Sequence, residues 1–192
     1  VNRLCGSGMQ AIVSAAQSLM LGDCEIAVAG GAEVMSRAPF LAPAMRWGRK
    51  MGDAVLVDAL NGALTDPFGG MLMGVTAENV ASRYNIDRAA QDALALLSQQ
   101  RAARAIAEGR FAGQIVPVEV KVRGKAVAFD KDEYVRDNAQ AGDFEKLRAI
   151  FREGGSVTAG NASGINDGAA AVVVATAKAV ADRKLTPLAR IV

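Results

Sequence analysis

A cysteine followed by three small residues, Cys5-Gly6-Ser7-Gly8, lies near the start of the 192-residue sequence, directly before a segment with helical spacing. At the N-terminus of a helix, unpaired N–H groups and the positive end of the helix dipole stabilise a thiolate, the nucleophilic form of cysteine. Glycine lets the backbone turn tightly and leaves an N–H free for the oxygen of an acyl group carried on sulfur. The pattern is typical of acyl transfer through Cys5. The alternative is a small packing cysteine before an ordinary turn.

The elements that must position this cysteine follow from the hydrophobic spacing. Apolar residues at three- and four-residue steps between Met9 and Met20 predict a helix that stops at Gly22. The run at 24–33 predicts a short buried strand, with Cys24 as a core residue rather than a catalytic partner. A second apolar run at 169–175 predicts another buried strand, followed by a short helix from about Ala177.

The middle of the chain differs from its ends in amino-acid composition. Residues 36–70 are rich in Pro, Met and Gly and predict an irregular segment with a short helix within 53–64. Thr76 and Asp87 are suitable N-cap residues for two further helices, and Gly109 ends the second. Alternating valines from Val116 to Val122 and the turn "RGK" predict an edge hairpin. The organisation is therefore an α/β core, a mainly helical insertion and a return to the core.

Composition bounds the class of protein. The chain is 51% hydrophobic and 22% charged, enough for one sizeable core or two small domains. The 22 basic and 20 acidic residues are spread along the chain, which gives no case for binding nucleic acid or a membrane surface. Apolar runs are interrupted short of the ~20 residues of a membrane span. Two cysteines and no signal-peptide pattern favour a reducing cytoplasm, and no metal site is expected.

Four motifs carry a resemblance to a known family. The stretches "VNRLCGSGMQAI", "AVAGGAEVMSRAPF", "MGVTAENVA" and "TAGNASGINDGAAA" resemble the thiolases in the same order and at similar separations. The likeness is strongest to the biosynthetic and broad-range β-ketothiolases and extends over essentially the whole chain. It implies a layered α/β thiolase-like fold and a transferase that acts on acyl-CoA thioesters in fatty acid metabolism.

The resemblance also implies roles for segments and residues. Residues 1–36 would belong to the N-terminal core, 37–154 to an inserted CoA-holding loop domain, 155–185 to the return, and 186–192 to the start of a C-terminal domain. The residue matching Cys5 is the nucleophile of a ping-pong acyl transfer, with CoA thioesters as substrates and no permanently bound cofactor. The family pattern further implies a polar contact from Ser163 to the pantetheine arm, a tunnel lining of Ala159 and Ile165, an adenine-end contact from Arg136, and pocket walls of Leu64, Met73 and Phe151.

Assembly is a further implication of the resemblance. The family uses the region around Arg46–Lys50 for subunit contacts, so we expect a homo-oligomer, a dimer or tetramer. An exposed Trp47 would suit such an interface.

Departures from the family pattern limit these expectations. Leu72 stands where many biosynthetic thiolases have a histidine, and the sequence contains no histidine and no Met at position 1. We therefore expect a piece of a longer protein, without the residues that the family's second half supplies, and inactive by itself. The alternative is a non-catalytic CoA- or protein-binding module. A ketoacyl synthase ranks lower, because that relative lacks this kind of insertion and the "TAGNASGIND" return.

Overall fold

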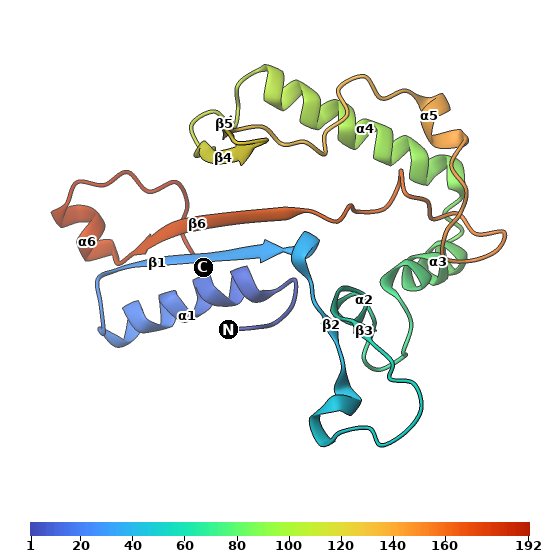
Figure 1. The fold of residues 1–192 in the computed structure, drawn as a ribbon. Helices are drawn as coiled ribbons and strands as arrows, with labels where there is room; N and C mark the ends of the chain where they lie inside the picture. Colours follow the sequence, from blue (N-terminus) through green and yellow to red (C-terminus); the bar gives the residue numbers. More distant parts are fainter. The chain divides into compact units, whose positions relative to one another are not determined.

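A computed structural model describes all 192 residues, which divide into two compact units. The first unit consists of Val1–Ala63 and Ile165–Val192, and the second of Leu64–Gly164. Figure 1 follows the chain through both. The second unit overlaps the predicted inserted domain over residues 64–154, and the assignment of that domain to CoA remains a prediction.

The first unit begins with helix α1, Ser7–Leu21, which confirms the helix expected from the apolar spacing. It ends at Gly22, whose φ of +82° is the left-handed conformation that closes many helices. The helix packs against strands β1 and β6. The segment Leu4–Leu21 is also apolar enough to span a membrane by length and composition alone, a test that the core helix of a soluble protein passes as well.

Strands β1 (Ile26–Val34) and β6 (Asp167–Ala175) form an antiparallel pair although they are far apart in the sequence. Their register runs from Ile26 opposite Ala175 to Val34 opposite Asp167. The two strands are the long blue and red arrows of Figure 1. Both strands were predicted. Their pairing confirms that the late apolar run returns to the first part of the chain.

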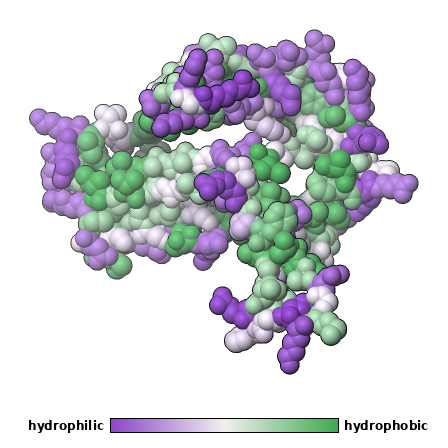
Figure 2. Space-filling model, in the orientation of Figure 1, coloured by the Kyte–Doolittle hydropathy of each residue, from purple (hydrophilic) through white to green (hydrophobic).

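The prediction that these two strands are buried is wrong for this structure. Helix α1 covers only one face of the two-stranded sheet, on which Ala29 is buried. On the other face Val28 and Val173 lie opposite each other and are 73% and 67% exposed. Figure 2 shows hydrophobic side chains at the surface of this unit. Cys24, expected in the core, is partly buried just before β1.

The rest of the first unit is made of short elements. They are the 3-10 helices Met35–Arg37 (η1) and Pro43–Trp47 (η2), strands β2 (Phe40–Leu41) and β3 (Val57–Asp58), and helices α2 (Ala59–Ala63) and α6 (Ala177–Asp182). Strands β2 and β3 pair antiparallel. Helix α2 confirms the short helix expected within 53–64, and α6 the one expected from Ala177.

The second unit contains helices α3 (Met73–Tyr84), α4 (Arg88–Ala107) and α5 (Ala141–Glu145). Asp87 is the N-cap of α4, as predicted, because its carboxylate accepts a hydrogen bond from Ala90 N–H at 2.7 Å. The prediction that Thr76 caps α3 is wrong: the cap is Leu72, whose carbonyl already accepts the N–H groups of Val75 and Thr76. The chain enters this helix directly from a β-bridge between Thr65 and Leu72, so no polar cap is used.

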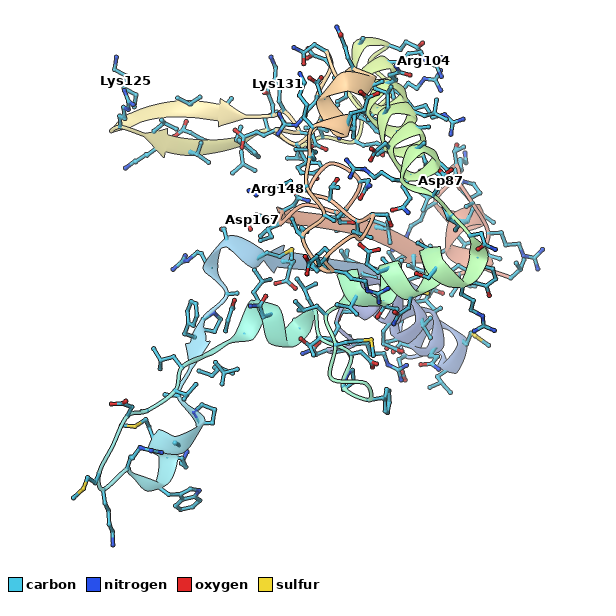
Figure 3. The ribbon with its side chains drawn as sticks, turned by 90° about the vertical axis from the view of Figure 1, so that its right-hand side faces the viewer. Asp87, Arg104, Lys125, Lys131, Arg148 and Asp167 are labelled. Carbon is cyan, nitrogen blue, oxygen red and sulfur yellow. The ribbon has the colours of Figure 1, made fainter.

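The predicted hairpin is present in the same unit. Strand β4 (Val118–Val122) pairs with β5 (Lys125–Phe129), and the turn residues Arg123 and Gly124 have φ values of +50° and +81°. Two consecutive left-handed residues are the geometry that matches the twist of a tight hairpin. Lys125 marks the tip in Figure 3.

Candidate functional site

Cys5 is exposed and stands two residues before the first residue of α1. The N-cap is Gly6, which has no side chain, and no side-chain hydrogen bond caps this helix. The first N–H groups of a helix lack partners inside it, so those of Gly8 and Met9, three and four residues after Cys5, have no backbone acceptor. This end of α1 is therefore suited to a negatively charged sulfur or an acyl oxygen.

The residue before the cysteine holds an uncommon backbone conformation. Leu4 has a φ of +51°, in the left-handed region that costs a non-glycine residue about 1–3 kcal/mol. Two side chains fix it: Asn2 Oδ1 accepts the Leu4 N–H at 2.9 Å, and the Ser7 hydroxyl donates to the Leu4 carbonyl at 2.7 Å. The turn that presents Cys5 is thus held on both sides.

A glycine contact brings this end of α1 close to the sheet. A Cβ on Gly31 of β1 would lie 3.8 Å from the Cα of Gly8. That spacing is an ordinary van der Waals contact, and a Cβ on Gly8 itself would meet nothing within 4 Å. The end of α1 next to Cys5 therefore lies close to β1, where the backbones of Gly8 and Gly31 approach each other.

In the second unit the motif 158–164 is held by a network of buried and partly buried polar groups. Thr158 is fully buried, and its N–H donates to Asn161 Oδ1 at 2.7 Å. The Asn161 amide group donates to Asp92 Oδ1 at 2.9 Å and to the Ser156 carbonyl at 3.0 Å. These bonds shape the turn that carries Ala159 and Ser163, both of which are exposed.

Glu78 of α3 is the buried charge beside this turn. Glu78 is only 3% exposed, and its carboxylate accepts hydrogen bonds from the N–H groups of Ser156 and Val157. Burial by itself would raise the pKa of Glu78, but the hydrogen bonds from Val157 and Ser156 outweigh it and hold the pKa below its ordinary value. The carboxylate is therefore charged at neutral pH.

The structure brings the three predicted wall residues together. Met73 N–H donates to the Leu64 carbonyl at 2.9 Å. The ring of Phe151 lies against Gly74, the residue after Met73, so closely that a Cβ on Gly74 would clash with the ring. Leu64, Met73 and Phe151 thus meet at the start of α3.

Arg136 and Ser163 lie on segments that touch. The Tyr134 hydroxyl donates to the Ala162 carbonyl at 3.3 Å, and its ring lies against Gly164. Arg136 is exposed, and its backbone N–H donates to Gln99 Oε1 at 2.8 Å. Ile165 belongs to the first unit and is 62% exposed. The binding role predicted for each of these residues remains a prediction.

Sequence reasoning missed Glu78, Asp92 and Asn161 as organisers of this region. A signal was present for Glu78: it lies three and four residues from Val75, Gly74 and Ala81, on a stripe of otherwise small or apolar residues. A carboxylate on such a stripe is buried only with partners. No comparable signal links Asp92 to Asn161, because that contact joins residues 69 positions apart.

Comparison with known proteins places this geometry in a family. The pattern describing the N-terminal domain of thiolases matches residues 1–178. The beta-ketothiolase BktB of Cupriavidus necator is 61% identical over 193 aligned residues, which cover 100% of this chain and 49% of that protein. An acetyl-CoA acetyltransferase of Chromobacterium violaceum is 50% identical, with 98% and 49% covered.

Solved structures agree in fold. The acetyl-CoA acetyltransferase of Bacillus anthracis superposes with a TM-score of 0.92 at 44% identity, covering 98% of this chain and 48% of that one. Human mitochondrial 3-ketoacyl-CoA thiolase in complex with CoA gives a TM-score of 0.90 at 41% identity, with 98% and 47% covered. The chain thus spans about half the length of the relatives it matches. By sequence and by fold, the chain belongs to the thiolase family, whose N-terminal domain it matches over residues 1–178.

Proposed function

We propose that this chain carries the nucleophile of a β-ketothiolase, an acyl-CoA:acetyl-CoA C-acyltransferase. In thiolysis the Cys5 thiolate would attack the 3-oxo carbon of a 3-oxoacyl-CoA, and the bond between C2 and C3 would break. The departing carbanion would take a proton and leave as acetyl-CoA. The thiol of a second CoA would then attack the acyl-cysteine, releasing a shortened acyl-CoA and a free Cys5.

The observation that carries this proposal is the environment of Cys5. The sulfur is exposed at the start of a helix whose cap has no side chain, so a substrate carbonyl can reach it and find free N–H groups. A packing cysteine would need neither exposure nor an uncapped helix end. The names of the relatives, beta-ketothiolase and acetyl-CoA acetyltransferase, support the same chemistry.

Coenzyme A is the proposed second substrate. The proposal gives Ser163 a polar contact to the pantetheine arm, Ala159 and Ile165 the lining of its path, and Arg136 the adenine end. Leu64, Met73 and Phe151 would contribute apolar walls. The solved complex of the human relative with CoA supports the class of ligand.

Three further attributes belong to the same proposal. They are a homo-oligomer, a cytoplasmic location and a role in fatty acid metabolism. The exposed Trp47 in η2 supports a subunit contact, since large exposed aromatic side chains are common at protein interfaces.

The test is transfer of an acetyl group to Cys5. A chimera in which this chain replaces the matching half of the Cupriavidus necator beta-ketothiolase would be mixed with acetyl-CoA and digested for mass spectrometry. We expect one acetyl group on the Cys5 peptide and thiolysis of acetoacetyl-CoA, both absent in Cys5→Ser. CoA binding without acetylation would instead favour a non-catalytic binding module.

A further inference from the structure

We infer that Glu78 is a positioning residue for the turn that receives CoA: its carboxylate fastens residues 156 and 157 to α3 and thereby sets the place of Ala159 and Ser163. The inference rests on the proposed function for its ligand. It adds a residue from another helix to that site. The fastening itself is a property of this chain that can be measured without any ligand.

The contacts of Glu78 are all directed at one segment. Oε1 accepts the Ser156 N–H at 2.9 Å and the Val157 N–H at 2.8 Å. Oε2 accepts the Ser156 N–H at 3.0 Å and the Ser156 hydroxyl at 3.1 Å. One carboxylate thus binds two consecutive backbone amides, and hydrogen bonds to a charged acceptor are stronger than those between neutral groups.

A glycine makes room for this contact. Gly155 lies so close to Glu78 Oε1 that a Cβ at this position would collide with the carboxylate. Its φ is not in the left-handed region, so the need for glycine comes from the atoms around it: the Glu78 carboxylate, and the Arg152 carbonyl oxygen, which would lie 2.9 Å from the same Cβ. The sequence "GGSV" at 154–157 is therefore fitted to the side chain on α3.

The fastened segment leads without a break into the turn. Val157 and Thr158 are buried, and Thr158 is bonded through its N–H to Asn161 and through its hydroxyl to the Gly160 N–H. Asn161 in turn reaches Asp92 on α4. Displacement of 156–157 would consequently be transmitted to Ala159 and Ser163, because few free backbone torsions separate them.

Hydrogen bonds, more than the nearby positive charge, explain why a carboxylate is suited to this buried place. The positive group that acts on it is Arg152, whose guanidinium also donates to Asn79 Oδ1 at 2.5 Å. An apolar residue at position 78 would leave the N–H groups of Ser156 and Val157 without acceptors. An unsatisfied buried donor is costly, so the segment would move toward water.

Amide hydrogen exchange of the 192-residue chain tests the fastening. The variants are Glu78→Gln, which removes the charge, and Gly155→Ala, which displaces the carboxylate from the other side. Glu153→Gln is the matched control, since Glu153 is exposed and makes no side-chain bond. We expect faster exchange in peptides covering 156–163 for the first two variants and not for the control, with protection of α4 unchanged in all three.

Binding of CoA, measured by titration calorimetry, tests the link to the ligand. If the competent placement of the turn falls to about a tenth of the population, the apparent Kd for CoA rises about tenfold. The double variant Glu78→Gln/Gly155→Ala should bind CoA as tightly as the weaker of the two single variants, because both substitutions disrupt the same contact. In the chimera with the Cupriavidus necator enzyme, KM for CoA should rise while kcat stays within about twofold, whereas loss of folded protein would lower kcat alone.

The outcomes separate the two ideas. Unchanged exchange of 156–163 in both variants overturns the inference whatever the wild type binds. Faster exchange with an unchanged Kd for CoA overturns the link between Glu78 and the ligand. A wild-type chain and chimera that bind no CoA overturn the proposed function, and the exchange data then still decide whether Glu78 fastens the turn.

Discussion

The carboxylate of Asp167 accepts two hydrogen bonds from Ser36, one from its N–H at 2.9 Å and one from its hydroxyl at 2.5 Å. Asp167 is the first residue of β6, labelled in Figure 3, and Ser36 follows the end of β1. The register places Asp167 opposite Val34, at the last pair of the sheet. These bonds therefore close the end of the only long strand pair in the first unit.

Loss of this contact should destabilise the first unit in a pH-dependent way. The hydrogen bonds from the Ser36 side chain and backbone hold the pKa of Asp167 below its ordinary value. A lowered folded-state pKa stabilises the fold above the unfolded pKa of about 3.9, and this stabilisation is lost as the pH falls through the folded value. Asp167→Asn should lower the urea midpoint at pH 7, and its difference from the wild type should shrink below about pH 4.

Asp23→Asn is the control for this experiment, because the Asp23 side chain makes no bond. Its midpoint should match the wild type at both pH values. An Asp167→Asn effect that stayed constant down to acid pH would contradict the assignment to the charged carboxylate. Ser36→Ala, which keeps the backbone donor, should have a smaller effect than Asp167→Asn.

The elements of the fold were predictable where a local signal was strong. The spacing between Met9 and Met20, the cap at Asp87 and the valine alternation before "RGK" each rest on residues close in sequence, and each element is present. The prediction that Thr76 caps α3 was wrong because the preference of a residue for the N-cap does not specify where the preceding chain enters the helix. The prediction that β1 is buried was wrong because burial of a strand depends on what covers the second face of its sheet.

The two cysteines should differ in reactivity. Cys5 is exposed in a turn, whereas Cys24 is partly buried just before β1. Iodoacetamide at neutral pH should therefore modify Cys5 faster than Cys24 in the folded chain, as followed by peptide mass spectrometry. In urea the two rates should converge, since the difference arises from the fold. Equal rates in the folded chain would refute the placement of Cys5.

Replacing Gly164 should loosen the segment next to Ser163. The ring of Tyr134 lies against Gly164, so an alanine Cβ would displace the ring and weaken its hydrogen bond to the Ala162 carbonyl. Because Tyr134 is partly exposed and its ring can move, the cost is that of the lost hydrogen bond, about 0.5–1.5 kcal/mol. We expect Gly164→Ala to lower the free energy of unfolding of the chain by that amount in urea titrations.

Gly142→Ala provides the matched comparison. Gly142 lies in α5, and nothing is within 4 Å of a Cβ at that position. Alanine is the better helix former, so this variant should be as stable as the wild type or more stable by about 0.5–1 kcal/mol. A loss of stability equal to that of Gly164→Ala would show that the contact with Tyr134 is not the cause.

The candidate site was less predictable than the fold, for a physical reason. Cys5 was identifiable because its neighbours in sequence carry the signal. The fastening of the turn by Glu78 and Asp92 was not, because it depends on contacts across 78 and 69 positions that no periodicity encodes. Buried polar networks of this kind are specified jointly by distant segments, so their members look like ordinary helix residues until the fold is known.

The 192-residue chain by itself should form no product from acetoacetyl-CoA. Thiolysis requires a group that takes the proton of the attacking thiol and another that protonates the departing carbanion. The sequence contains no histidine, and the Cys5 side chain has no hydrogen-bond partner in the structure. Interaction with the helix dipole is worth about 0.3–1 kcal/mol, far less than a positioned base contributes.

Loss of acetoacetyl-CoA, followed by its absorbance with CoA present, should therefore not exceed the rate for Cys5→Ser at any protein concentration. The chimera with the Cupriavidus necator enzyme should restore turnover. A rate for the chain alone that rises with its concentration and disappears in Cys5→Ser would contradict the prediction and would require a base within these 192 residues.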